Sequence, residues 1–317
     1  MMKYLDFEKP VADLAGKIQE LRSLGDDGSG VGINDEIAKL EIKADQALAD
    51  LYQKLTPWQK TQVARHPDRP HFVDYANTLI EDFTPLSGDR KFAEDEAIIA
   101  GIGRFRGRSI AIMGHERGND TKSRIRHNFG SARPEGYRKA VRIMDMAEKF
   151  SLPVVSIVDT AGAYPGVGAE ERGQAEAIAR STDRCLALSV PNIAVIVGEG
   201  GSGGAIAIAT CNRVMMLENA IYSVISPEGA ASILWRDSAR ARDAASTMKI
   251  TAQDLMQLNV IDSIINEPVG GAHREAAQTI HAVGDAIEKQ LSDLENRSAE
   301  QIREERRERF LNIGRTL

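Results

Sequence analysis

Apolar residues recur at helical spacing along residues 1–90. Two amphipathic stripes are clear, one over residues 11–21 and another over residues 37–51. The glycine-rich segment Gly25–Gly32 between them is expected to be a flexible connector. Thr56 followed by Pro57 is typical of a helix start. Residues 1–90 are therefore predicted to form a helical arm that packs against another surface and carries no catalytic group.

The pattern changes near Ala97, where continuously apolar runs begin to alternate with helical segments. Strands are predicted at 97–105, 108–115, 153–158, 193–197, 214–217 and 221–225, and helices at 134–150, 170–188 and 203–209. Arg106-Gly107 should join the first two strands as a hairpin. Strands that are apolar throughout and alternate with helices indicate a buried, mostly parallel sheet in an α/β fold, here residues 91–272.

From His273 to residue 317 the pattern is helical again. Arg303–Phe310 (REERRERF) mixes charges of both signs, and it is predicted to be the solvated face of a helix.

Composition narrows the class of protein. The chain has 317 residues, of which 42% are hydrophobic and 27% charged, and its net charge is −6. These values suit a globular protein and argue against general nucleic-acid binding. No apolar run is long enough to span a membrane and no secretion signal is visible, so a cytoplasmic location is expected. Cys185 and Cys211 are expected to be buried reduced thiols, and the histidines show no metal-ligand spacing.

The most informative segment is VIVGEGGSGGAIAIA, residues 195–209. A buried strand ends, five of the seven residues from Gly198 to Gly204 are glycine, and a short helix begins. Glycine lets a ligand approach the backbone, and a helix N-terminus presents free N–H groups. Such a turn favours a negative charge.

Three kinds of site fit this loop. Gly198-x-Gly200-x-x-Gly203, with Glu218 after the next strand, imitates a dinucleotide fingerprint, although the helix that follows is short for that use.

Gly200-x-Ser202-x-Gly204 matches a nucleophile elbow, and a serine hydrolase would have to recruit Asp262 with His273 or His281. His273 lies in a Gly-Gly-Ala-His-Arg turn and His281 on an amphipathic helix, where structural roles are the simpler explanation.

The third possibility uses backbone alone, with the N–H groups of Gly203 and Gly204 forming an oxyanion hole. A second loop, Asp159–Glu171 (DTAGAYPGVGAEE), also follows a buried strand and precedes a helix. Two such loops on neighbouring strands can place amides around one oxygen atom.

These two loops, extended to Gln174 and Ala205, resemble the carboxyltransferase alpha-subunit family of acetyl-CoA carboxylase. The resemblance covers nearly the whole chain through LDFEKPVADL (5–14), ARHPDRP (64–70), NFGSARPEGYRKA (128–140), YSVISPEGAASILW (222–235) and IDSIINEPVGGAHR (261–274). One departure is Ala161, where the family usually has proline; the alanine loosens the loop and adds an amide donor.

The resemblance implies a crotonase-like fold, a spiral of β-β-α units with an N-terminal helical arm and C-terminal helices. It implies a beta subunit that carries a zinc finger and the acyl-CoA site, and an α2β2 assembly. Biotin should arrive on a separate biotin carboxyl carrier protein, loaded by an ATP-dependent biotin carboxylase. Thr247-Met248-Lys249-Ile250 is a poor copy of the biotinylation sequence Ala-Met-Lys-Met. The implied product is malonyl-CoA for cytoplasmic fatty acid synthesis.

For the site, the resemblance implies that Gly203 and Gly204 stabilise negative charge on the biotin ureido oxygen. Gly162, Ala163, Gly201 and Ser202 are candidates for lining the biotin pocket. Ser202 is then a loop spacer and no side-chain base is needed, because the biotin anion can remove the α-proton of acetyl-CoA. Without its partner the chain could instead be a catalytically silent assembly subunit.

A basic stretch runs from Arg104 to Arg142, with eleven Lys or Arg against three acidic residues. Such a stretch is often solvated surface or a subunit interface. It could also attract the phosphates of CoA or an acidic carrier, with Lys122, Arg124 and Arg126 as the candidates.

Overall fold

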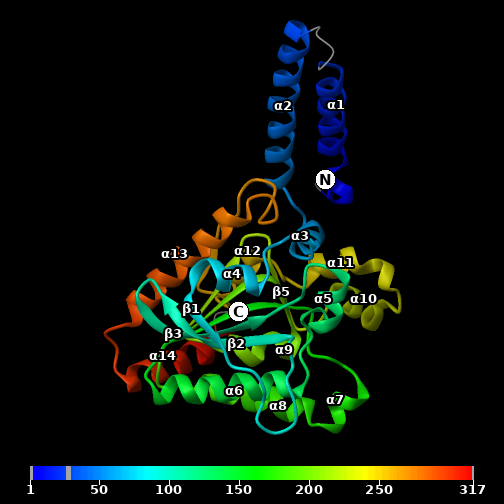
Figure 1. Ribbon diagram of the computed structural model, residues 1–317. Helices are drawn as coiled ribbons and strands as arrows, with labels where there is room; N and C mark the ends of the chain where they lie inside the picture. Colours follow the sequence, from blue (N-terminus) through cyan, green and yellow to red (C-terminus); the bar gives the residue numbers. More distant parts are fainter. Residues whose placement is uncertain (1–2, 26–29, 316–317) are drawn as a thin grey trace.

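The computed structural model describes residues 3–25 and 30–315. Helices α1 (Lys9–Gly25) and α2 (Gly30–Tyr52) run side by side and project from the body of the molecule (Figure 1). Of the predicted connector, residues 26–29 lie outside the described residues, while residues 30–32 belong to α2 and are therefore helical. A short 3-10 helix, η1 (Asp6–Glu8), precedes the arm.

The base of the arm is fixed by a buried carboxylate. Glu8 is fully buried and accepts hydrogen bonds from the Tyr52 hydroxyl at 3.0 Å and from Arg274 at 2.8 Å. A buried carboxylate is stable only when it is paired in this way. Glu8 thus connects both ends of the arm to the segment that precedes the C-terminal helices.

Three further elements connect the arm to the sheet: α3 (Pro57–Ala64), α4 (Phe72–Leu79) and β1 (Glu81–Pro85). Thr56 caps α3, as its position before a proline predicts, by accepting the N–H of Gln59. Strand β1 was not predicted; it is mostly exposed, its register shifts between Glu81 and Thr84, and Asp82 has a φ of 51°.

One eight-stranded sheet forms the centre of the molecule, in the order β1-β2-β3-β4-β5-β6-β8, with β7 paired to β5. Its other strands are β2 (Ile98–Phe105), β3 (Arg108–His115), β4 (Val154–Thr160), β5 (Asn192–Gly201), β6 (Arg213–Leu217), β7 (Ile221–Ser223) and β8 (Ser263–Ile265). β1, β2 and β3 are antiparallel, and every pairing from β3 onward is parallel. The predicted hairpin is confirmed: Arg106 and Gly107 both have positive φ, as a two-residue turn requires.

Helices cover both faces of this sheet (Figure 1). α6 (Pro134–Lys149), α8 (Gln174–Ala187) and α9 (Ser202–Ala209) pack together below it in this view, and α4 and α13 (Ala276–Leu294) lie above. The remaining helices are α5 (Thr121–Arg126), η2 (Asn128–Gly130), α7 (Val167–Glu171), α10 (Pro227–Trp235), η3 (Ser238–Arg240), α11 (Ala241–Thr247), α12 (Ala252–Gln257) and α14 (Ala299–Asn312). The predicted helix over 170–188 is divided between α7 and α8 because Gly173 adopts the left-handed conformation.

Between these layers, β4 is buried along its whole length and β5 in all but its last residue. Cys185 and Cys211 are buried free thiols, as predicted. In the described part of the chain, none of the helices has the length and apolar character needed to cross a membrane.

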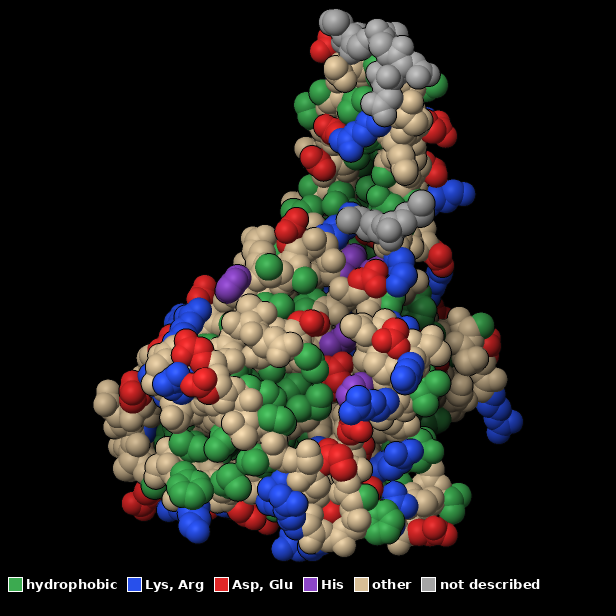
Figure 2. All heavy atoms as spheres, in the orientation of Figure 1, with side chains coloured by type: hydrophobic (Ala, Val, Ile, Leu, Met, Phe, Trp, Pro, Cys, Tyr) green, Lys and Arg blue, Asp and Glu red, His purple; other side chains and the backbone are tan. Residues whose placement is uncertain are grey.

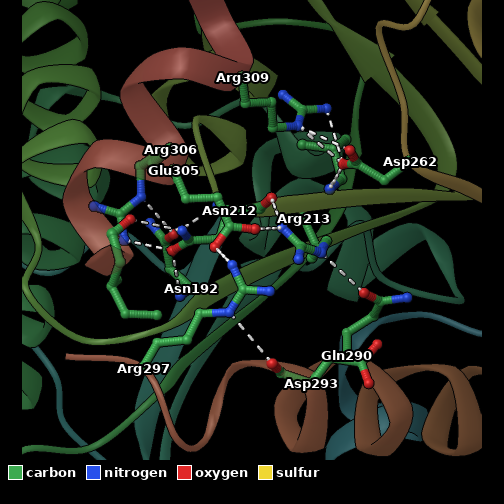
Figure 3. Close-up of polar contacts among 12 residues, drawn as sticks. Asn192, Asn212, Arg213, Asp262, Gln290, Asp293, Arg297, Glu305, Arg306 and Arg309 are labelled. Carbon is green, nitrogen blue, oxygen red and sulfur yellow. Dashed lines mark hydrogen bonds and ion pairs between the residues drawn. The ribbon is translucent and has the colours of Figure 1, made fainter. Parts of the chain in front are cut away.

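The prediction of a solvated face for Arg303–Phe310 is wrong at one position. Arg306 is completely buried, although its neighbours at 303, 304, 307 and 308 are exposed. Ile302 and Arg306 are four residues apart on α14, so they share the inward face of the helix. The Arg306 guanidinium donates to five oxygens: the carbonyls of Leu186, Leu188 and Val190 and the side-chain oxygens of Asn192 and Asn212. Figure 3 shows the contacts with the two asparagines.

Candidate active site

Two glycine loops leave the sheet at the carboxyl ends of β4 and β5 and touch through their backbones. A side chain on Gly201 would collide with the Ala161 carbonyl. A Cβ on Gly204 would lie 2.9 Å from the backbone of both Gly162 and Ala163. Glycine is required at these two positions because the loops approach too closely for any side chain.

The loops bring all six predicted pocket residues together: Gly162, Ala163, Gly201, Ser202, Gly203 and Gly204. Gly203 and Gly204 lie in the first turn of α9, where N–H groups have no partner within the helix. Among the described residues, neither N–H donates to a side-chain acceptor or to the carbonyl of a turn or loop. The Gly162 N–H, in contrast, donates to the Thr160 hydroxyl at 3.1 Å. The amides of Gly203 and Gly204 therefore lie at the N-terminus of α9, close to the first loop.

A layer of buried charge lies next to the loops. Asp159 ends the apolar part of β4 and Glu199 lies on β5, and each is less than 5% exposed. Arg117 approaches Asp159 at 3.1 Å and Glu199 at 3.4 Å, and Arg65 pairs with Glu199. Burial alone would raise the pKa of Asp159, but the Arg117 guanidinium and further hydrogen bonds hold that pKa well below its usual range.

His71 completes this layer. Its Nδ1 lies 3.9 Å from Asp159, which is too far for a hydrogen bond, and within the described part of the chain neither ring nitrogen has a hydrogen-bond partner. Burial would lower the pKa of His71, but the Asp159 carboxylate outweighs that effect and raises it.

A small cavity of about 120 Å³ opens beside these groups. On the face shown in Figure 2, histidine side chains lie among acidic and basic ones below the arm. The cavity is lined by Ala64, Arg65, His66, Pro67, His71, Arg117, Gly118, Arg124, Phe129 and Asp159. Of the predicted basic trio, Arg124 lines this cavity, Arg126 pairs with Glu96, and Lys122 is exposed.

The geometry disfavours a serine hydrolase. Ser202 has a φ of 55° at a sharp strand-to-helix turn, which matches a nucleophile elbow. Asp262, however, accepts the Val214 N–H at the opposite end of the parallel strands and pairs with Arg309. His273 stacks on His66 at 3.7 Å between ring centroids.

A triad through His281 and a dinucleotide site are disfavoured as well. His281 is exposed on α13, and in the described residues the Ser202 hydroxyl has no hydrogen bond to a histidine or carboxylate. A dinucleotide would need a longer crossover helix after the glycines, and α9 has only eight residues. Within residues 3–25 and 30–315, no cluster of three or more histidine, cysteine or acidic side chains could hold a metal ion.

The charged layer was not assigned a role from the sequence. Arg65 and His71 lie in one stretch, at the two ends of the connection between α3 and α4, but Arg117 is far along the chain and no local motif joins it to them. A signal did exist for the carboxylates: Asp159 directly follows one apolar run, and Glu199 follows another after a single glycine, so each stands where a strand passes into a glycine loop. In a parallel sheet, such equivalent positions on neighbouring strands lie side by side.

Solved structures with the same architecture are crotonase-fold carboxyltransferases and related enzymes. Transcarboxylase 12S has a TM-score of 0.58 at 19% identity, over 73% of this chain and 44% of that one. The beta subunit of geranyl-CoA carboxylase from P. aeruginosa has a TM-score of 0.55 at 15% identity, over 78% and 46%. A Pseudomonas malonate decarboxylase hetero-dimer has a TM-score of 0.55 at 16% identity, over 69% and 89%. The predicted crotonase-like fold is confirmed.

Sequence relatives define the family within this class. The family described as "Acetyl co-enzyme A carboxylase carboxyltransferase-like" matches residues 4–314. The acetyl-coenzyme A carboxylase carboxyl transferase subunit alpha of Rhizobium leguminosarum bv. trifolii is 65% identical over 317 residues, which is all of both chains. The same subunit of Xanthobacter autotrophicus is 66% identical over the same length. The chain belongs to the family of acetyl-CoA carboxylase carboxyltransferase alpha subunits.

Proposed function

We propose that this chain and a carboxyltransferase beta subunit together transfer a carboxyl group from carboxybiotin to acetyl-CoA, which yields malonyl-CoA. The observation that carries the proposal is the pair of N–H groups at Gly203 and Gly204 in the first turn of α9, where Gly204 packs against the backbone of the first loop. Family membership supports the reaction class, and the site supports the role of this subunit within it.

The pocket suits the ureido ring of biotin. Gly162, Ala163, Gly201, Ser202 and Gly203 are all partly accessible, so a ring can reach backbone amides with no side chain between. When bound, biotin supplies the carboxyl group and afterwards a base for the α-proton of acetyl-CoA. Gly203 and Gly204 donate their N–H groups to an oxygen on which negative charge develops, and the positive end of α9 adds to this stabilisation. Such donors accelerate a step because they act most strongly on its transition state.

The test is the reverse reaction, malonyl-CoA decarboxylation with free biocytin as acceptor. It is run with this chain alone, with a zinc-bearing beta subunit alone, and with the mixture. Activity in the mixture only is the expected result. An inactive mixture that still forms a complex would indicate a catalytically silent assembly subunit. Ester hydrolysis by the chain alone would support a serine hydrolase that uses Ser202.

We propose that Lys122 and Arg124, with a smaller contribution from Arg126, attract the phosphates of CoA or an acidic carrier protein. Lys122 is exposed and Arg124 lines the cavity, whereas Arg126 is already paired with Glu96. Changing all three to Gln should raise the Michaelis constant for malonyl-CoA at low salt and flatten its salt dependence. An unchanged salt dependence would exclude them from this role.

The wider assembly is also a proposal. We expect an α2β2 complex in the cytoplasm that works with a biotin carboxyl carrier protein and an ATP-dependent biotin carboxylase in fatty acid biosynthesis, with zinc in the beta subunit. In this proposal residues 91–272 form the carboxyltransferase core. The arm within residues 1–90 and the helices within residues 273–317 are candidate surfaces for contact with other subunits. The arm exposes Ile42 at 71%, which suits a surface that another chain covers. Light scattering of the mixture should give the mass of four chains.

A further inference from the structure

We infer that Asp159 is a positioning residue that sets the spacing between the two glycine loops. The inference rests on the proposed oxyanion role of Gly203 and Gly204. It begins with an irregularity in the sheet. Val158 pairs with Ile196, but Thr160 pairs with Gly200, so two steps along β4 correspond to four steps along β5. The extra residues form a bulge on β5 immediately before its glycine loop.

The Asp159 side chain fills this bulge. Its Oδ1 accepts the Glu199 N–H at 2.9 Å and so replaces a bond that the interrupted strand pairing cannot supply. Gly198 leaves room for the carboxylate, because a Cβ at that position would collide with Oδ1. One carboxylate from the first loop therefore determines where the second loop leaves the sheet.

Charge holds the carboxylate in this position. Arg117 donates to the same Oδ1 at 3.1 Å and also contacts Glu199 at 3.4 Å, so one guanidinium connects the bases of both loops. Arg65 extends the connection from Glu199 to Glu228 at 2.6 Å. Asp159 is only 3% exposed, so solvent screens these attractions weakly.

The consequence for catalysis is geometric. Beyond the bulge the loops are in backbone contact, with the position of a Gly204 Cβ only 2.9 Å from the Ala163 nitrogen. A shift of the bulge would move the Gly203 and Gly204 amides relative to the first loop. A misplacement of roughly 1 Å can reduce a rate about 100-fold. Asp159 touches neither substrate nor cofactor in this scheme; it acts through the position of the amides.

The test uses matched variants of the full chain with the beta subunit. Asp262 is the control, because it too accepts a strand N–H, from Val214, and pairs with an arginine, Arg309, but at the opposite end of the strands. Asp159→Asn keeps an acceptor for the Glu199 N–H and loses the charge, while Asp159→Ala loses both. The readouts are kcat and KM for malonyl-CoA, the fraction of assembled complex, and Tm.

We expect kcat to fall about 10-fold in Asp159→Asn and about 100-fold in Asp159→Ala, with KM for malonyl-CoA within about 2-fold of the original chain. Asp262→Asn and Asp262→Ala should lower Tm and leave kcat within about 2-fold. If Asp159→Ala does not fold, the inference is tested by comparing kcat of Asp159→Asn with kcat of Asp262→Asn.

The inference would be overturned by equal losses of kcat at positions 159 and 262. It would also be overturned if Asp159→Asn lost as much kcat as Asp159→Ala, or if only KM changed. An inactive mixture of the unaltered subunits would instead refute the proposed function itself.

Discussion

Replacement of Arg306 by leucine should be among the most destabilising single changes in this chain. The guanidinium is completely buried and donates to three backbone carbonyls and to the side-chain oxygens of Asn192 and Asn212. None of these five acceptors is a carboxylate, so the contact is a set of charge-assisted hydrogen bonds. Leucine fills most of the space but removes the Arg306 donor from all five oxygens, of which Asn192 Oδ1 and Asn212 Oδ1 each keep a backbone N–H.

The magnitude follows from two opposing contributions. A hydrogen bond from a charged donor contributes about 1.5–3 kcal/mol, so five would sum to roughly 7–15 kcal/mol. Burial of the guanidinium costs several kcal/mol, and leucine avoids that cost. The lower sum, about 7 kcal/mol, less a burial cost of roughly 3 kcal/mol gives a loss of about 4 kcal/mol in the free energy of unfolding.

Equilibrium urea unfolding of the isolated chain, followed by circular dichroism, measures this loss. Arg307→Leu is the matched control on the same helix, since the Arg307 side chain is 68% exposed and pairs with Glu304, which is also exposed. That control should change the free energy of unfolding by less than about 0.5 kcal/mol. A loss below about 1 kcal/mol for Arg306→Leu, or equal losses for both variants, would refute the argument from burial.

Three further predictions concern the loops and His115. Gly204→Ala should reduce kcat more than 10-fold, because the new Cβ forces the two loops apart. A Cβ at Gly203 meets only the Ile178 side chain, at 3.3 Å, so Gly203→Ala should reduce kcat less than about 3-fold. Equal losses of kcat in steady-state assays would contradict this. Ser202→Ala should keep most of the activity, and a loss as large as that of a catalytic serine would support the hydrolase. Burial lowers the pKa of His115 to about 4, so the folded state binds its proton less well than the unfolded state, and stability falls as pH decreases from about 6.5 towards 4. His115→Phe should remove roughly 2 kcal/mol of this pH dependence between pH 7 and pH 5 in urea titrations, and an unchanged pH dependence would refute this role of His115.

The strands of the core could be predicted because their apolar runs depend on burial alone. The hairpin at Arg106-Gly107 and the helix start at Thr56 could be predicted because each depends on neighbours in the sequence. Strand β1 could not, since EDFTP has little strand character and is held by its pairing with β2.

The candidate site divides in the same way. The glycine loops were visible because backbone freedom is encoded by the residue type itself. The contacts of Asp159 with Arg117 and His71 were not visible, because they join residues 42 and 88 positions away in the chain. The burial of Arg306 was not predicted for a related reason. Its partners Leu188 and Val190 lie in the turn that leads into β5, more than 100 residues before α14 in the sequence.

The two edges of the sheet limit how another chain can associate with this one. At one edge, β1 carries Glu81 and Asp82, a bent backbone and a terminal proline. At the other edge, β8 has only three residues and packs against α12 and α13. Charge, curvature, proline and short length each discourage the addition of a strand. Continuous intermolecular sheets and edge-to-edge aggregation are therefore disfavoured, and a second chain is left to dock through helices and loops.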